Sequence, residues 1–325
     1  MKIGVIGAGA WGTALAQVAA SDGKPVTLWA LEPEVVDAVN QTHENTHYLA
    51  GVPLNPAIRA TGSLADLDDC DALLVVTPAQ HVRRVLSGMT VGTRPLVLCS
   101  KGIEAGTQKL VSEIVAEVQP QAPIAVISGP TFAAEVARGL PTAVTLACAD
   151  DAAAQALAER MAQPYFRPYL SNDVVGAEIG GAVKNVLAIA CGVVEGLGLG
   201  LNARAALIAR GFAEMTRFGT ARGARAETLG GLSGLGDLVL TCSSTQSRNF
   251  SLGHGLGEGR PASELLADRR TVAEGAFTAP VLHQAARAAG VEMPVVEAVC
   301  ALLENSAPVG VVVADMLSRP IRAET

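Results

Sequence analysis

A single lysine interrupts the most apolar stretch of the chain. The stretch EIGGAVKNVLAIACGVVEGLGLG, from Glu178 to Gly200, holds Lys184 among glycine, alanine and aliphatic residues. A bare ammonium group in such surroundings is costly unless it is paired or solvated. One explanation is chemical, because a positioned lysine can donate or accept a proton in a reaction. The other is a snorkelling lysine that carries its charge to the surface, and the stretch alone leaves both open.

Further polar residues gather in three otherwise apolar segments. SKGIE and SGPTFAAEV each follow a predicted strand, and doubly wound sheets bind their ligands at such strand ends. The tripeptide SRN, within GLSGLGDLVLTCSSTQSRNFSLG, offers a hydroxyl, a guanidinium and an amide, which together suit a phosphate or a polyol. Taken singly, each of these residues is more often structural. The candidates are Lys101, Gly129, Thr131, Ala133, Asp237, Ser247, Arg248 and Asn249.

The start of the chain carries a dinucleotide-binding pattern. Gly7, Gly9 and Gly12 form GAGAWG, a G-x-G-x-x-G that follows a predicted strand and opens a predicted helix. Such glycines permit a tight turn, close approach of a pyrophosphate and close packing of helix on strand. The pattern predicts an NAD(P) site that includes Ala10 and Trp11 between the glycines.

One acidic residue bears on the choice between the two cofactors. Glu32 follows the second predicted strand, 20 residues after Gly12. An acid there favours the 2′-hydroxyl of NAD, whereas an arginine favours the 2′-phosphate of NADP. The alternative is a solvated charge at a helix start, beside Pro33.

A second motif matches the sequence pattern of a zinc site. His43, Glu44 and His47 spell HENTH, which matches the HExxH of zinc proteases. That motif requires a helix, and the Asn and Thr inside it are poor helix formers. The glycine and proline that soon follow end any helix, and no third ligand is evident. We expect a polar surface turn and no metal.

Strands and helices must bring these residues together. The first half of the chain alternates β-branched runs with amphipathic stretches, which indicates an α/β fold with a Rossmann-type, doubly wound parallel sheet. After about Leu170 the alternation stops. We expect a dinucleotide-binding domain over 1–170 and an all-helical substrate and catalytic domain over 171–325. The expected strands are 2–7, 25–30, 72–77, 95–100, 124–129 and 142–148, and the expected later helices are 173–197, 203–222, 263–268, 278–289 and 294–304.

Composition and charge narrow the class of protein. Half of the 325 residues are hydrophobic and 34 are glycine, which suits a compact α/β protein of two domains. The net charge of −7 argues against a nucleic-acid partner but leaves room for a local basic pocket. Single cysteines without a CxxC pair fit a reduced, cytoplasmic protein. The early glycines do not suit a signal peptide, and Lys184, Glu195 and several glycines break the nearest candidate for a membrane span.

Taken together, the motifs resemble the bacterial NAD(P)-dependent glycerol-3-phosphate dehydrogenases. The resemblance implies a Rossmann domain followed by a helical substrate domain. It also implies reversible hydride transfer between NAD(P)H and dihydroxyacetone phosphate, giving sn-glycerol 3-phosphate for phospholipid synthesis. The similar segments cover nearly the whole chain in order: GAGAWGTALA, VTPAQ, SKGIE, SGPTFAAEVARGLPTAV, EIGGAVKNVLAIACGVVEGLGLGLNARAALIARG, GLSGLGDLVLTCSSTQSRN and TVAEGAFTAPVLHQAARAAGVEMPV.

The resemblance also implies residue roles. It makes Lys184 the catalytic proton donor and acceptor, and Asp237 has the type and region to keep it charged. The family often carries arginine after the second strand where this chain has Ala30-Leu31-Glu32, which puts a preference for NADP in doubt. The implied substrate contacts are Lys101, Gly129, Thr131, Lys184, Asp237, Ser247, Arg248 and Asn249. The implied cofactor contacts are Trp11, Lys101, Ala133, Arg248, Val272 and Glu274.

Two other functions compete with this reading. A dehydrogenase of another substrate is one, although the SRN cluster favours a phosphorylated substrate. A dinucleotide-sensing protein without catalysis is the other, although Lys184 argues against it. The expected partner is a small phosphorylated substrate, with no nucleic acid and no membrane span. The sequence leaves the oligomeric state open, a homodimer included.

Overall fold

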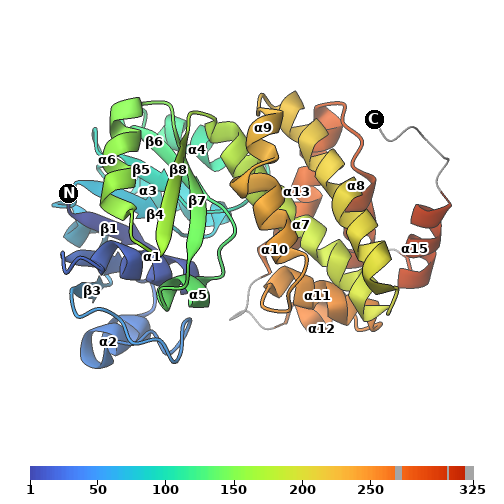
Figure 1. Ribbon diagram of the computed structural model, residues 1–325, viewed down its shortest axis with the longest axis horizontal. Helices are drawn as coiled ribbons and strands as arrows, with labels where there is room; N and C mark the ends of the chain where they lie inside the picture. Colours follow the sequence, from blue (N-terminus) through green and yellow to red (C-terminus); the bar gives the residue numbers. More distant parts are fainter. Residues whose placement is uncertain (268–272, 306, 319–325) are drawn as a thin grey trace.

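The first half of the chain folds around one eight-stranded sheet, with strands in the order β3-β2-β1-β4-β5-β6-β7-β8 (Figure 1). The computed structural model describes residues 1–267, 273–305 and 307–318. The strands are β1 (Ile3–Ile6), β2 (Val26–Trp29), β3 (Ile58–Thr61), β4 (Ala72–Val75), β5 (Leu96–Leu98), β6 (Ile124–Ser128), β7 (Thr142–Cys148) and β8 (Phe166–Ser171). The Rossmann-type α/β fold expected from the alternating pattern is confirmed.

The sheet departs from the prediction in two ways. Strand β7 pairs antiparallel with β6, so the sheet is not wholly parallel. Alternation of apolar residues is the same in either direction, which is why the sequence did not reveal this reversal. Strands β3 and β8 were not predicted. Strand β8 lies at the edge of the sheet and carries Pro168 and mostly exposed or half-exposed residues, so it lacks a strong apolar signal.

Helices cover both faces of the sheet. One face packs against α1 (Ala10–Ala20) and α5 (Ala133–Ala137), and the other packs against α3 (Ala79–Ser87) and α4 (Val111–Val118). Two separate clusters of buried residues form these layers. The remaining helices of this half are α2 (Pro33–Thr42), the 3₁₀ turn η1 (Leu64–Leu67) and α6 (Asp151–Met161).

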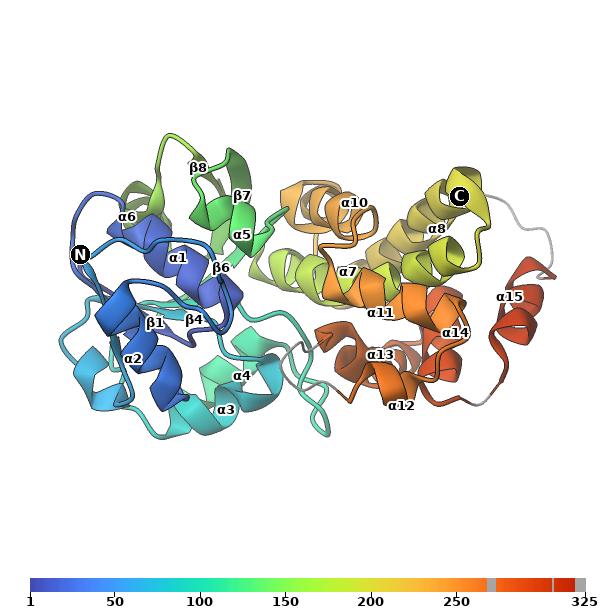
Figure 2. The ribbon, with the colours of Figure 1, turned by 90° about the horizontal axis from the view of Figure 1, so that it is seen from below.

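The second half is helical and is organised around α7 (Val174–Gly196), within the predicted range 173–197. Figure 2 shows α7 leading from the sheet half into the helical half. Four predicted ranges correspond to α8 (Gly200–Ala221), α12 (Ala262–Leu265), α13 (Glu274–Ala288) and α14 (Pro294–Leu303), and α13 begins earlier than predicted. The unpredicted elements are α9 (Ala226–Leu229), the π-helical turn η2 (Leu232–Gly236), α10 (Asp237–Thr241), α11 (Arg248–Gly257) and α15 (Val309–Leu317).

The glycines of α7 serve close helix packing. A Cβ atom on Gly192 would lie 2.0 Å from the carbonyl oxygen of Phe250 on α11. In the reverse direction, a Cβ on Gly253 would lie 1.9 Å from the carbonyl oxygen of Ile189. Side chains at these positions would therefore push the two helix backbones apart. The small residues of α7 are therefore explained by close packing of helix on helix.

Helix α7 is also long and apolar enough to pass a test for a membrane span. In the described part of the chain no other helix does so, and 83% of the apolar window of α7 is buried inside the protein. Core helices of soluble proteins pass the same test, so its composition is weak evidence for a membrane. The six cysteines are all buried and unpaired, as expected for thiols that behave as small apolar side chains.

Candidate active site

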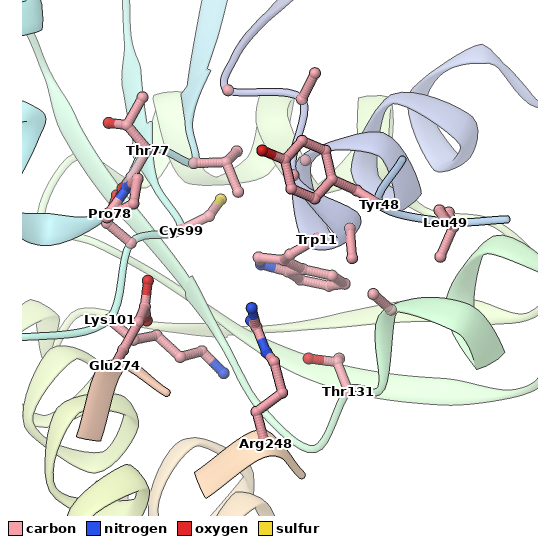
Figure 3. A pocket seen from close by; sticks show the side chains of 18 of the residues that line it. Trp11, Tyr48, Leu49, Thr77, Pro78, Cys99, Lys101, Thr131, Arg248 and Glu274 are labelled. Carbon is pink, nitrogen blue, oxygen red and sulfur yellow. The ribbon is translucent and has the colours of Figure 1, made fainter. Parts of the chain in front are cut away.

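A cavity of about 670 Å³ lies where the two halves of the chain meet. The sheet half contributes the glycine loop and the segments that follow β4 and β5, and the helical half contributes residues of α7, α10, α11 and α13. Figure 3 shows Trp11, Lys101 and Arg248 extending into this cavity from α1, the segment after β5, and α11. Residues far apart in the sequence therefore meet at one site.

The glycine loop has the geometry that a dinucleotide pyrophosphate requires. Gly7 has a φ of +115°, and a Cβ on Gly12 would lie 1.8 Å from the carbonyl oxygen of Gly7. A Cβ on Gly9 would meet no atom within 4 Å, so the space above this residue is open. Gly9 is the N-cap of α1 and supplies no side-chain cap, which leaves first-turn N–H groups available for an anion.

Two buried polar atoms in the same cavity have no hydrogen-bond partner among the residues that the structure describes. They are Nε1 of Trp11 and Oγ1 of Thr77. Buried polar atoms normally have hydrogen-bond partners, so unsatisfied ones in a cavity mark places where a ligand or water can bind. The loop and these two atoms fit an NAD(P) cofactor.

An aspartate joins two lysines beside the cavity. Lys184 Nζ donates to Asp237 Oδ1 at 2.6 Å and to Thr241 Oγ1 at 2.9 Å. Lys101 Nζ donates to the other carboxylate oxygen of Asp237 at 2.8 Å. The side chain of Asp237 is fully buried, and those of Lys184 and Lys101 are only 7% and 15% exposed. The suggested pairing of Asp237 with Lys184 is confirmed, and Lys184 does not snorkel to the surface.

The two lysines differ in their affinity for protons. Burial, together with the positive charge of Lys101, lowers the pKa of Lys184 to about 8, although Asp237 opposes the shift. Burial also acts to lower the pKa of Lys101, but Asp237 outweighs it and the pKa is raised. Burial tends to raise the pKa of Asp237, and the two lysines reverse that tendency and lower it. Lys101 and Asp237 therefore stay charged near neutral pH, while Lys184 can exchange its proton.

Helix α11 presents the SRN cluster to the cavity. Ser247 is its N-cap and accepts a hydrogen bond from the backbone N–H of Phe250 at 3.2 Å. Arg248 begins the helix and reaches into the cavity (Figure 3). The side-chain oxygen of Asn249 accepts a hydrogen bond from the N–H of Gly275 at 2.9 Å, which ties α11 to α13. All three members of the cluster line the cavity.

The other predicted site residues occupy different depths. Thr131, Ala133, Glu274 and the predicted residues of the glycine loop line the cavity. Glu274 is half-buried, and desolvation of its carboxyl group raises its pKa against the opposing charges of Arg248 and the two lysines. Gly129 and Asp237 do not line the cavity, and Asp237 contacts three residues that do, the two lysines and Thr241. Val272 lies outside the described residues.

Glu32 also lines the cavity, where its carboxylate accepts a hydrogen bond from the hydroxyl of Tyr48 at 3.0 Å. It is at the same time the N-cap of α2, which is the helix-start position of the alternative interpretation, and its contact with the ribose stays a prediction. Tyr48 was not among the predicted residues, because an isolated tyrosine in a loop carries no pattern.

The segment HENTH is not helical, since α2 ends at Thr42. His43 has a positive φ, and Glu44 Oε1 accepts a hydrogen bond from the N–H of Gly51 at 2.7 Å. Among the described residues there is no group of three or more His, Cys, Asp or Glu placed to hold a metal. The expectation of a surface turn is wrong for Asn45, which is fully buried. Its amide nitrogen donates to the carbonyl oxygen of Ala8 and to Thr13 Oγ1, both at 2.8 Å, so it braces the glycine loop.

Thr241 is a further residue that the sequence analysis missed. It lies four residues after Asp237 on α10 and shares its helix face. That spacing could have singled it out if the Gly-rich segment had been predicted to be helical.

Comparisons with known proteins agree on one family. The model of the NAD-dependent glycerol-3-phosphate dehydrogenase N-terminus matches residues 2–154, and that of the C-terminus matches residues 173–314. The chain is 63% identical to glycerol-3-phosphate dehydrogenase [NAD(P)+] of Novosphingobium aromaticivorans, over 99% of this chain and 98% of that protein. It is 58% identical to the protein of the same description from Caulobacter vibrioides, with the same coverage. The crystal structure of glycerol-3-phosphate dehydrogenase from Coxiella burnetii is similar, with a TM-score of 0.94, 40% identity and coverage of 98% of this chain and 99% of that one.

Proposed function

The chain belongs to the NAD-dependent glycerol-3-phosphate dehydrogenase family and is an NAD(P)-dependent oxidoreductase, and on that premise we propose how its cavity works. The cavity reduces dihydroxyacetone phosphate to sn-glycerol 3-phosphate and catalyses the reverse oxidation. The dinucleotide-binding part, 1–170, holds the cofactor, and the helical part, 171–325, supplies the proton and grips the substrate. The observation that carries this proposal is the Lys184–Asp237–Lys101 cluster beside a glycine loop.

Lys184 is the proposed proton donor. NAD(P)H supplies the hydride when it is bound, and the carbonyl oxygen of the substrate then needs a proton. With its pKa near 8, Lys184 is protonated at neutral pH and can still give its proton up. Its charge also polarises the carbonyl before transfer.

Asp237 and Thr241 position that proton. Both accept hydrogen bonds from Lys184 Nζ, which leaves one of its three N–H bonds to point elsewhere. The carboxylate of Asp237 is shared with Lys101, whose raised pKa keeps a second positive charge beside the substrate. The arrangement holds Lys184 in place without neutralising the site.

The phosphate of the substrate binds at α11 in this proposal. Arg248 offers a guanidinium fork, and Ser247 and Asn249 add a hydroxyl and an amide in the same wall. Gly129 and Thr131 follow β6 on the substrate side, with Thr131 in the wall of the cavity and Gly129 behind it. On the cofactor side, Trp11, Lys101, Ala133 and Arg248 lie beside the glycine loop, and Glu274 closes the wall from α13.

The proposed reaction also has a place in the cell and in metabolism. We infer a cytoplasmic enzyme that supplies the glycerol phosphate used in phospholipid synthesis and takes a small phosphorylated substrate rather than a nucleic acid.

The test is an assay of the purified protein with NADH and NADPH and two ketones. Dihydroxyacetone phosphate and dihydroxyacetone share the reacting carbonyl and differ only in the phosphate. We expect kcat/KM to be at least about 100-fold higher for the phosphorylated ketone, because a charge-assisted phosphate contact is worth roughly 3 kcal/mol. Equal rates, or no oxidation of either cofactor, would refute the assignment.

A further inference from the structure

The contact between Tyr48 and Glu32 bears on which cofactor the chain accepts. The hydroxyl of Tyr48 donates to Glu32 Oε1 at 3.0 Å, and both residues line the cavity that contains the glycine loop. Glu32 lies three residues after Trp29, the last residue of β2, whose carbonyl oxygen accepts a hydrogen bond from the N–H of Gly7 in the glycine loop. In folds of this type the end of the second strand faces the ribose of the adenosine half.

Tyr48 is itself held in place by the glycine loop. Its backbone N–H donates to Asn45 Oδ1 at 3.1 Å. The amide nitrogen of the fully buried Asn45 donates to the carbonyl oxygen of Ala8 and to Thr13 Oγ1. A chain of hydrogen bonds therefore links the phosphate-binding loop to the carboxylate of Glu32, and that carboxylate is oriented before any ligand arrives.

The chemistry of this contact favours one cofactor. Burial, and then the hydrogen bond to Glu32, raise the pKa of Tyr48, so its hydroxyl remains a donor. With Oε1 engaged, Oε2 of Glu32 can accept from a ribose hydroxyl, as a carboxylate with several acceptor sites can. A 2′-phosphate at the same place would bring a second negative charge against an ionised carboxylate.

We propose that Tyr48 and Glu32 together select NADH over NADPH, with Glu32 as the specificity-determining carboxylate and Tyr48 as the residue that positions it. This inference rests on the proposed function only for the location of the cofactor. Arg84 and His81 line the same cavity from α3, and Arg84 is the competing determinant, because a cation there would attract a 2′-phosphate.

The experiment is a direct titration of both cofactors in the absence of substrate. Dissociation constants for NADH and NADPH are measured by fluorescence for the wild type, Tyr48→Phe, Glu32→Ala and the double variant. Because no ketone is present, the result is readable even if the protein fails to reduce dihydroxyacetone phosphate, so the two proposals can fail separately.

The expected pattern is specific. Tyr48→Phe should raise the dissociation constant for NADH about 3- to 10-fold, the effect of one hydrogen bond. It should leave the dissociation constant for NADPH within about twofold of the wild type. Glu32→Ala should raise the dissociation constant for NADH by a similar factor. It should lower the dissociation constant for NADPH about 10-fold or more, since the opposing charge is gone. In the Glu32→Ala background, Tyr48→Phe should change neither constant by more than about twofold, because the two residues act as one unit.

Three controls separate this role from a structural one. Tyr169→Phe, on β8 outside the cavity wall, makes the same chemical change, and Glu34→Ala removes a neighbouring charge of α2. Neither should shift the ratio of the two constants. Glu32→Gln keeps the shape and the contact with Tyr48, so it should retain NADH binding better than Glu32→Ala and still gain NADPH binding. The proposal is overturned if the wild type binds NADPH more tightly than NADH, if Tyr48→Phe weakens the binding of both cofactors equally, or if the effect of Tyr48→Phe persists without Glu32.

Discussion

At the scale of single residues, the site is an arrangement of charges that control one another. Lys184 is buried and has a lowered pKa, whereas Lys101 shares the same carboxylate and has a raised one. The difference arises because burial and like charge dominate at Lys184, while attraction to Asp237 dominates at Lys101. The sequence could single out each of these residues by type, but not their relative proton affinities, which depend on burial and on distances between segments 50 and more residues apart.

The lowered pKa of Lys184 predicts opposite pH dependences for the two directions of the reaction. Ketone reduction requires the protonated lysine, so kcat/KM should be flat below about pH 8 and fall up to about tenfold per pH unit above it. Alcohol oxidation requires the neutral lysine and should rise to a plateau above the same pH. Steady-state rates in both directions between about pH 6 and 10 check this. Profiles that run parallel in the two directions would contradict it.

Arg248 should act on the phosphate and not on the carbonyl. In Arg248→Ala we expect KM for dihydroxyacetone phosphate to rise about 30- to 150-fold, corresponding to roughly 2–3 kcal/mol for a lost charge-assisted contact. The same variant should hardly change the slow reaction with dihydroxyacetone, which has no phosphate. Arg210→Ala, an exposed residue of α8, serves as the matched control. An unchanged KM in Arg248→Ala would remove this residue from the phosphate site.

At the scale of elements, prediction from sequence succeeded where the apolar pattern was long and failed where glycine and serine concealed it. Helix α7 was predicted within a residue at each end because its apolar run is long. Residues 232–257 form η2, α10 and α11 although their composition suggests a loop. Glycine is unfavourable in an isolated helix, but here it permits backbone contact with α7, and this tertiary gain outweighs the local preference.

The crossing of α7 and α11 should tolerate no added atom. In Gly192→Ala the new methyl would meet the carbonyl oxygen of Phe250 at 2.0 Å, so we expect a loss of about 1–3 kcal/mol in unfolding free energy. Gly310→Ala in α15 has no atom within 4 Å of the new methyl and should be neutral or slightly stabilising. Chemical denaturation of both variants measures the difference. Equal stabilities would mean that the helices can separate without cost.

At the scale of the whole molecule, each half holds only part of the site. The sheet half contains the glycine loop and Lys101, and the helical half contains Lys184, Asp237 and Arg248. Sequence motifs could assign these residues to their halves. They could not show that Asp237 bridges lysines of both halves, because that contact depends on how the sheet and the helices pack.

A second polar contact between the halves should make stability depend on pH. Glu178 on α7 accepts hydrogen bonds from the backbone N–H of Ser112, at 2.9 Å, and from its hydroxyl, on α4. Burial raises the pKa of Glu178 from 4.5 to about 7. The Glu178 carboxyl group therefore binds its proton more tightly in the folded protein than in the unfolded chain. Its contribution to the free energy of unfolding is full below pH 4.5 and is lost as pH rises through about 7.

Relative to Glu178→Gln, the wild type should lose on the order of 1 kcal/mol of unfolding free energy per pH unit across that window. Chemical denaturation of both proteins at several pH values across it provides the comparison. A difference that stays constant with pH would show that Glu178 is ionised in the folded state throughout.

In the proposed reaction Lys184 gives its proton to the substrate, and the variant Lys184→Met removes that proton. The substitution keeps most of the side-chain length, and Asp237 keeps its ion pair with Lys101, so no buried charge is left unpaired and the fold should be retained. One preparation is examined by thermal melting, cofactor titration and rate assay, beside Lys24→Met, which changes an exposed lysine. We predict an intact fold, a dissociation constant for NADH within about twofold of the wild type, and a fall in kcat of about 10²- to 10⁴-fold, the usual contribution of a general acid. Should Lys184→Met fail to fold, Lys184→Arg, which keeps the charge but does not readily give up a proton, is expected to fold and to show the same loss. A folded variant that reduces dihydroxyacetone phosphate at a near-normal rate would show that Lys184 is not the proton donor.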